Sequence, residues 1–330
     1  MSVTAHEQLI AGYRALHDSV GAHRVDRDVL SVSGPDAVTY LQGQSSQDVA
    51  GLAVGETAES LLLSPQGKLD AYLRVTRTGD DAFILDTDPG FGEVAKGRLL
   101  RFRLRVKVEI EPLAWQAMAV RGPDAELPGV VTAAAATDPS VLRLPVDWPG
   151  FSGFDLLGPA TDDGGAEAWV DETVVRVGPE TWEAARIEAG VPANGRELTD
   201  ATIAAEAGLV ERTVSFTKGC FTGQELVARL DSRGSKVAKK LAGLVIDGGT
   251  GAGGEADDLP PAGAAVWTLD GEHEVGRLTS VAWSPRFSAP VALATLHRRV
   301  TPPETVAVRW EADGTARQVD AEARPLPLVT

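Results

Sequence analysis

The sequence predicts an α+β protein that ends in an all-β domain. Apolar residues recur at helical spacing near the N-terminus and again in 182–189, whereas 57–76 carries two strand patterns separated by a turn. After residue 240 only short, closely spaced strand patterns follow, which are typical of a small β-barrel or sandwich. We therefore divide the chain into two regions, 1–235 and 236–330.

Helix and strand patterns alternate through the first 110 residues. The first helix is predicted by Leu9, Ile10, Tyr13, Leu16 and Val20. A second helix opens at Pro35, where a missing N–H costs no hydrogen bond, and runs toward Gln44. A third is expected at 89–100, and the expected strands are 28–33, 57–64, 68–76 and 82–85. Apolar and basic residues then alternate in 101–108, which predicts a half-buried strand.

The second half of the chain contains fewer helices. Residues 121–140 and 162–165 lack periodicity and are expected to form loops. Helices are expected at 182–189 and 222–230, with a short strand at 212–216 between them. The C-terminal strands are expected at 241–246, 263–269, 273–283, 290–296, 304–310 and 315–323.

Composition limits the classes of function. The chain has 330 residues, 31 basic against 47 acidic, and a net charge of −16, so extensive nucleic-acid binding is not expected. No apolar run approaches the ~20 residues of a membrane helix, and the N-terminus has no signal-peptide pattern. We expect a cytoplasmic protein that does not associate with membranes.

The cysteine and histidine content argues against a metal site. Cys220 is the single cysteine, which excludes an intramolecular disulfide and a zinc or iron–sulfur site built only from this chain's thiolates. The five histidines do not occur at metal-ligand spacing. We therefore expect no metal ligands.

The segment 218–225, KGCFTGQE, is the most informative candidate site. Thr222 and Glu225 have capping-box spacing, so Thr222 is the expected N-cap of a helix. Cys220 then lies just before the helix, and both the helix terminus and Lys218 favour its thiolate. These two residues are candidate catalytic groups. The alternative is a buried structural cysteine in a helix-entry loop.

Glu188 is a second candidate. It is expected on the last turn of the helix 182–189, between Ile187 and Ala189. A carboxylate can accept two N–H bonds from a planar heterocycle that carries an amino group, such as a pterin. The alternative is a glutamate on the helix surface.

Two basic stretches stand out against the acidic background. Arg101, Arg103, Arg105 and Lys107 would share one face of the expected strand, and a weaker group contains Arg229, Arg233, Lys236, Lys239 and Lys240. Either could attract an anionic ligand tail or a partner, although the strand face could equally be solvated. The GxGxxG match at 249–254 is read as a loop, because no helix follows it to bind phosphate.

These motifs resemble those of a known protein family. The strings RIEAGVPANGRELTD and EAGLVERTVSFTKGCFTGQELVARLDSRG, with VSGPDAVTYLQGQSSQDV and LLLSPQGKLDAYLRV, resemble the YgfZ proteins. These are folate-binding relatives of the glycine-cleavage T-protein, an aminomethyltransferase. The family motif K-G-C-[FY]-x-G-Q-E is complete in 218–225, and the resemblance covers about 28–110 and 180–300.

The resemblance implies a three-lobed, T-protein-like fold with a central folate-binding opening and a C-terminal β-barrel. It implies tetrahydrofolate, or a one-carbon derivative of it, as the cofactor. The residues placed at the opening are Cys220 and Lys218, with Glu188 holding the pterin and Asp70, Gln44, Asp48, Gln224 and Arg229 completing the binding set.

The implied function is an accessory role in the assembly, insertion or repair of iron–sulfur clusters in client enzymes, carried out by a monomer. The alternative is a folate-dependent one-carbon transferase. Only Asp70 matches the adjacent aspartates of T-proteins, which favours the accessory role. A third hypothesis is a noncatalytic scaffold that docks clients through the basic strand.

Overall fold

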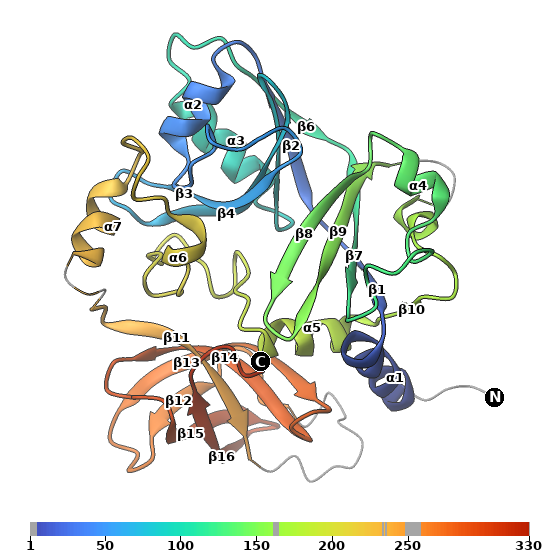
Figure 1. Ribbon diagram of the computed structural model, residues 1–330. Coiled ribbons are helices and arrows are strands. Elements are labelled where there is room, and N and C mark those ends of the chain that lie inside the picture. Colours follow the sequence, from blue (N-terminus) through green and yellow to red (C-terminus); the bar gives the residue numbers. More distant parts are fainter. Residues whose placement is uncertain (1–4, 161–164, 233, 235, 248–258, 330) are drawn as a thin grey trace.

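The computed structural model describes residues 5–160, 165–232, 234, 236–247 and 259–329, and they form two five-stranded sheets and a closed barrel. The three lobes are arranged around the middle of the molecule (Figure 1). This confirms the predicted three-lobed α+β fold with a C-terminal barrel. The discarded GxGxxG match at 249–254 lies outside the described residues.

The first sheet has the strand order β3-β4-β5-β2-β6. Its strands are β2 (Asp28–Ser33), β3 (Thr57–Leu63), β4 (Leu69–Gly79), β5 (Ala82–Thr87) and β6 (Glu109–Leu113). Helices α2 (Ala37–Gln44) and α3 (Gly92–Arg101) cover one face, where Leu41 and Leu99 pack against the strand residues Val32 and Leu73. One side of the predicted β3–β4 hairpin faces this core, and the other side contributes to a separate apolar cluster.

The second sheet has the order β10-β1-β7-β9-β8. Its strands are β1 (Gly21–Val25), β7 (Trp115–Arg121), β8 (Leu142–Trp148), β9 (Phe151–Pro159) and β10 (Val175–Arg176). The short helices α4 (Ala133–Thr137) and η1 (Gly165–Trp169) pack on one face. The chain passes from β1 into the first sheet and returns at β7, so the two lobes are intertwined.

The closed barrel has the order β11-β14-β13-β12-β15-β16, and β16 pairs back to β11. Its strands are β11 (Lys239–Ile246), β12 (Ala265–Thr268), β13 (Glu274–Ser284), β14 (Ala289–His297), β15 (Glu304–Ala312) and β16 (Thr315–Arg324). All six predicted C-terminal strands are present. The division of the chain at 235/236 stays a prediction.

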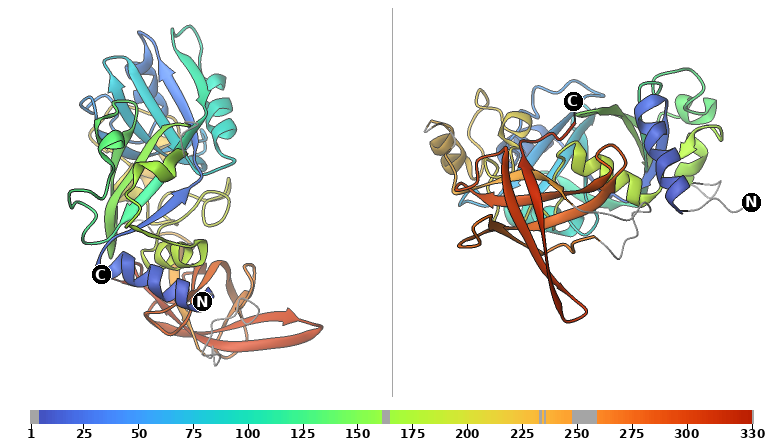
Figure 2. Two further views of the ribbon diagram at one scale, coloured as in Figure 1. Left: turned by 90° about the vertical axis from the view of Figure 1, so that its right-hand side faces the viewer. Right: turned by 90° about the horizontal axis from the view of Figure 1, so that it is seen from below.

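Helices α1 (Ala5–Asp18) and α5 (Pro179–Glu188) lie between the second sheet and the barrel (Figures 1 and 2). Ala184 and Ile187 of α5 pack against Val291 and Leu293 of the barrel. Arg186 extends this contact, since its guanidinium donates to the Ser280 hydroxyl at 2.6 Å. Helix α5 therefore joins the barrel to the sheet lobes.

Two predicted strands are absent. Residues 102–108 form turns and irregular backbone instead of a strand, because Arg105 takes a φ of 58° and Leu104 is 79% exposed. The basic residues of this stretch therefore do not share a strand face, which removes the geometry on which the scaffold hypothesis depended. The predicted strand at 212–216 is also wrong, because the short helix α6 (Val210–Thr213) occupies its start.

The predicted loop and helix cap are also corrected. The region 121–140 contains the short helix α4. Helix α7 (Gln224–Asp231) is capped by Gly223 rather than by Thr222, because Gly223 has a left-handed φ of 83° and directs the chain into the helix. A Cβ at Gly223 would lie 2.6 Å from the carbonyl oxygen of Ser64.

We expect Gly223→Ala to lower the free energy of unfolding by about 1–3 kcal/mol, because the substitution combines an unfavourable φ with a clash against the backbone. The measurement is the midpoint of thermal unfolding. Gly219→Ala is the control, since a Cβ there would meet nothing within 4 Å. Equal midpoints for the two variants would contradict the close approach of α7 to the β3–β4 turn.

Candidate functional site

A cavity of about 570 Å³ lies between the two sheet lobes. Its walls come from β3 and β4 of the first sheet, from β7, β8 and β9 of the second sheet, and from α5. This volume is typical of a small-molecule site. Five arginines line the cavity, namely Arg27, Arg74, Arg121, Arg186 and Arg212. We call it the central cavity.

Buried ion pairs join the two sheets at the central cavity. Arg74 of β4 pairs with Asp86 at 2.7 Å and with Asp155 of β9 at 2.5 Å. Arg121 of β7 pairs with Asp155 at 2.8 Å. Burial alone would raise the pKa of Asp155, but the two guanidinium groups lower it to about 2. The carboxylate is therefore charged at neutral pH, and one acid connects both sheets.

Two indoles form an aromatic wall of the cavity. The ring centres of Trp148 and Trp182 lie 4.9 Å apart, and His23 stacks on the Trp182 ring at 4.9 Å. The Arg121 guanidinium lies 5.0 Å from the Trp148 ring centre and 5.3 Å from that of Trp182. The Nε–H of Arg121 is buried and has no hydrogen-bond partner among the described residues. The cavity thus offers a planar ligand both a stacking surface and a free donor.

Lys218 lies apart from the central cavity, at the C-terminal end of α2. Its Nζ donates to the carbonyl oxygens of Gln42, Ser45 and Gln47 at 2.6–2.8 Å. Carbonyls at a helix end lack partners within the helix, and a lysine can supply them. An ammonium has three protons, so this arrangement leaves none for the Cys220 thiolate. The expected Lys218–Cys220 pairing is not formed.

Three of the predicted binding residues lie near Lys218. Gln44 accepts a hydrogen bond from Arg98 at 2.9 Å, and Arg98 also pairs with Asp70 at 3.1 Å. Asp48 accepts from the Gln42 amide at 2.8 Å. Burial raises the pKa of Asp70, although Arg98 opposes this effect. The structure thus brings Lys218, Gln44, Asp48 and Asp70 into one region, held by protein partners and outside the lining of the central cavity.

Cys220 is exposed, which excludes the buried structural alternative. The side-chain oxygen of Gln224 accepts from the Phe221 N–H at 3.3 Å, in the turn that precedes α7. Arg229 is exposed on the last turn of α7. None of the three lines the central cavity, so their predicted roles stay predictions.

Glu188 ends α5 as predicted, but its side chain is 0% exposed and does not line the central cavity. The Tyr13 hydroxyl donates to its Oε2 at 2.6 Å. Oε1 has no hydrogen-bond partner among the described residues. Burial raises the pKa of the carboxyl, and the nearby Ser284 hydroxyl and Tyr13 oppose this. The surface alternative is wrong, and this placement does not support direct contact with a pterin.

The sequence reasoning missed the residues that do line the cavity. The sequence pattern places Trp182 at the start of a helix without indicating a role, and Trp148 lies in a stretch without a recognised pattern. A usable signal was present, since Trp182 and Arg186 are four residues apart and so share one face of α5. Both side chains line the central cavity.

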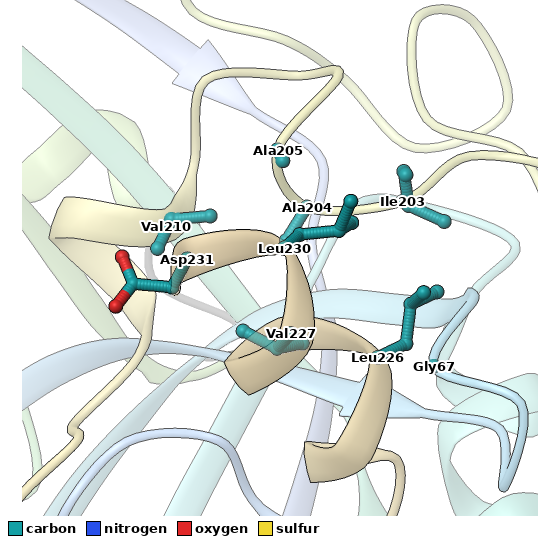
Figure 3. A pocket seen from close by; sticks show the side chains of 9 residues that line it. All are labelled: Gly67, Ile203, Ala204, Ala205, Val210, Leu226, Val227, Leu230 and Asp231. Carbon is teal, nitrogen blue, oxygen red and sulfur yellow. The ribbon is translucent and has the colours of Figure 1, made fainter. Parts of the chain in front are cut away.

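A smaller hollow lies between α7 and the segment that precedes α6 (Figure 3). Leu226, Val227 and Leu230 approach Ile203 and Val210 there, as the figure shows. The hollow has a volume of about 10 Å³, which is near the minimum for one water molecule. It is a packing gap between two segments and not a ligand site.

The comparisons with known proteins agree with this architecture. The family model of the glycine cleavage T-protein C-terminal barrel domain matches residues 239–329. The tRNA-modifying protein YgfZ of Klebsiella pneumoniae is 30% identical over 230 residues, which cover 64% of this chain and 67% of that protein. The chain belongs to the YgfZ family.

This YgfZ-family protein is also similar to aminomethyltransferases. The aminomethyltransferase of Corynebacterium jeikeium is 25% identical over 352 residues, covering 94% of this chain and 86% of that protein. The crystal structure of glycine cleavage system aminomethyltransferase T from Bartonella henselae superposes with a TM-score of 0.80 at 22% identity, covering 97% and 89% of the two chains. The predicted family and fold are confirmed.

Within the described ranges, no group of three His, Cys, Asp or Glu side chains is placed to hold a metal ion. No helix in that part of the chain has both the length and the apolar character to cross a membrane.

We expect Lys218 to make the free energy of unfolding depend on pH in the alkaline range. Burial lowers its pKa to about 8, with Asp48 opposing, whereas an unfolded lysine titrates near 10.4. Between these values the unfolded chain binds more protons, so the contribution of Lys218 becomes more favourable as the pH rises. The unfolding midpoint of the wild type should therefore rise relative to that of Lys218→Met between pH 8 and about 10.4.

Lys107→Met, at an exposed position away from α2, is the matched control. If the unfolding midpoint of the wild type instead falls relative to that of Lys218→Met as the pH rises, the three carbonyl oxygens stabilise the ammonium more than burial destabilises it. Such a result would contradict the lowered pKa.

Proposed function

We propose that the central cavity binds the pterin ring of tetrahydrofolate, or of a one-carbon derivative, and that the protein serves iron–sulfur enzymes as an accessory factor. The observation that carries the first part is the pair of indoles beside Arg121. A pterin is planar and aromatic, and offset stacking on indoles stabilises such rings. The bound folate would supply the nitrogen atoms that carry one-carbon units.

The polar groups of the cavity fit the edge of a pterin. Arg121 Nε–H can donate to a ring carbonyl or ring nitrogen, since it has no partner within the described residues. Asp147 lines the same cavity and is exposed, and its carboxylate makes no side-chain hydrogen bond or ion pair within the described residues, although it interacts electrostatically with Arg212. A free carboxylate can accept from the amino group and the adjacent N–H of the ring. We propose that Asp147 makes the contact with the pterin that the sequence suggested for Glu188.

We expect Trp148→Leu and Trp182→Leu each to weaken tetrahydrofolate binding about tenfold or more, because stacking on an aromatic side chain contributes on the order of 1–3 kcal/mol per ring. Isothermal titration calorimetry measures the dissociation constants. Trp267→Leu, on barrel strand β12, is the matched control. Unchanged affinity in both cavity variants would remove the pterin from this cavity.

Glu188→Gln, titrated in the same way, separates the two candidate carboxylates. Loss of affinity would support contact between Glu188 and the pterin. Unchanged affinity together with a lower unfolding midpoint would agree with its burial against Tyr13.

The iron–sulfur role is supported by the family resemblance and by the exposure of Cys220. We expect Cys220→Ala to fail in restoring iron–sulfur enzyme activities to a strain that lacks the gene, assayed under oxidative stress. Ala228→Ser, at an exposed position in the middle of α7, is the control and should restore them. Full restoration by Cys220→Ala would exclude the thiol as the working group, and unaffected enzyme activities in the deletion strain would exclude the role itself.

The one-carbon transferase alternative requires that the protein itself catalyses transfer of a one-carbon unit to the folate. The chain is similar to an aminomethyltransferase over most of its length, so an activity assay is the test that separates the two functions. Asp70, its expected catalytic group, is paired with Arg98 and does not line the central cavity. Formation of methylene-tetrahydrofolate from a methylamine-type donor by the purified protein would favour this alternative over the accessory role.

A further inference from the structure

A loop of basic and apolar residues connects α3 to β6, at the end of the molecule away from the barrel (Figure 1). The segment 94–108 contains six basic residues and no acidic one. Leu104 is 79% exposed, and Leu100 on the last turn of α3 is 40% exposed. We call residues 100–107 the basic loop. Its exposed cations are Arg101, Arg103, Arg105 and Lys107.

The cations of the basic loop are available to a partner, since none of the four forms an ion pair with a described residue. Arg101 acts electrostatically on Asp70, and Arg103 acts on Tyr40 and donates to the Val108 carbonyl oxygen at 2.9 Å. The side chains of the other two cations form no hydrogen bond within that part of the chain. In a chain of net charge −16, four such cations next to two exposed leucines favour an anionic and partly apolar partner.

Contacts with the rest of the lobe hold the basic loop in shape. Near its start, the Phe102 ring centre lies 4.1 Å from the Arg98 guanidinium. At its end, the backbone N–H of Lys107 donates to the Asp36 carboxylate at 2.7 Å. Between these anchors Arg105 takes a left-handed φ of 58°, which few side chains adopt. A loop whose shape is set before binding loses less conformational entropy when a partner docks.

The basic loop belongs to the same lobe as Cys220. Arg98, which anchors the start of the loop, donates to Gln44 at 2.9 Å. The carbonyl oxygen of Gly43 accepts from the Thr222 N–H at 3.1 Å, and Thr222 follows Cys220 by two positions. A short series of contacts through α2 and α3 therefore joins the loop to the segment that carries the exposed thiol.

We propose that the basic loop docks an acidic segment of a client iron–sulfur enzyme, and that this segment also presents an apolar side chain to Leu104. The inference rests on the proposed function, since Cys220 is the group that such a client has to reach. Guanidinium groups bind carboxylates through two parallel hydrogen bonds, and arginine is enriched at protein interfaces. Docking here differs from a noncatalytic scaffold, because it brings the client to the lobe that carries the working thiol.

Other anionic partners fit the basic loop less well. The phosphodiester backbone of RNA has no apolar surface for Leu104, and the net charge of −16 repels a long polyanion. A membrane would meet two exposed leucines and no exposed aromatic side chain in the loop, which is little apolar area for insertion. A protein segment can match both the cations and the leucines over the area of the loop alone.

The test uses a purified client, namely the apo form of an iron–sulfur enzyme whose activity falls in the strain that lacks the gene. Biolayer interferometry measures its dissociation constant with each variant. We expect Arg105→Glu/Lys107→Glu to weaken binding about tenfold or more at low ionic strength, because two attractive charge contacts become repulsive. Salt should weaken the binding of wild type more than that of this variant. Leu104→Ser should also weaken binding, because the apolar contact is lost.

Arg14→Glu/Arg299→Glu makes the same change of charge at two exposed positions outside the basic loop, and it should bind the client as wild type does. Cys220→Ala should also bind normally, because its loop is unchanged. Both loop variants should keep the unfolding midpoint of wild type, since the substituted side chains are exposed. A loss of client binding with an unchanged midpoint then reports on docking and not on folding.

Client binding that neither loop variant weakens, or no client binding by wild type, overturns the inference and leaves the proposed function intact. Two other probes are poly(U) and vesicles of equal parts phosphatidylglycerol and phosphatidylcholine. If the charge variant loses binding to either probe while it still binds the client, the loop serves RNA or membranes and the inference is wrong. Unaffected iron–sulfur enzyme activities in the deletion strain would instead refute the proposed function, and the inference with it.

Discussion

The ion pairs of Asp155 hold the two sheet lobes together. This one carboxylate accepts from Arg74 of the first sheet and from Arg121 of the second. Buried charges are costly unless they are paired, so separating the lobes at this point would leave buried charges without partners. That arrangement leaves the central cavity open between the sheets. The same residues that fix the lobes therefore also set the positive charge of the cavity wall.

Local patterns predicted the elements whose burial follows a simple period. The barrel strands and the β3–β4 hairpin were found from sequence, because strand-type residues are bounded there by turn signals. Alternation alone misled at 102–108, because a left-handed φ at Arg105 turns the chain away from a strand. Thr222 had the expected spacing for a cap, yet the close approach of Gly223 to Ser64 decides where α7 begins. The second of these failures comes from a tertiary contact that no local window contains.

Only the part of the candidate site that a local motif marks was predictable from the sequence. The family motif led to Lys218 and its neighbours, which the structure brings together around α2. The central cavity escaped prediction because its walls meet only when the two sheets pack. Arg74 and Asp155 are separated by 81 positions, and Trp148 and Trp182 come from different elements of the fold. Only the pairing of strands from intertwined lobes places these side chains together.

Closure of the barrel limits how another protein can join this molecule. Because β16 pairs with β11, the six described barrel strands leave no strand edge unpaired to which an extended peptide could be added. The two open sheets differ from the barrel in this respect, because β3, β6, β8 and β10 are edge strands. Association by main-chain pairing is thus restricted to these four edges, and any contact with the barrel has to be made by its side chains and loops.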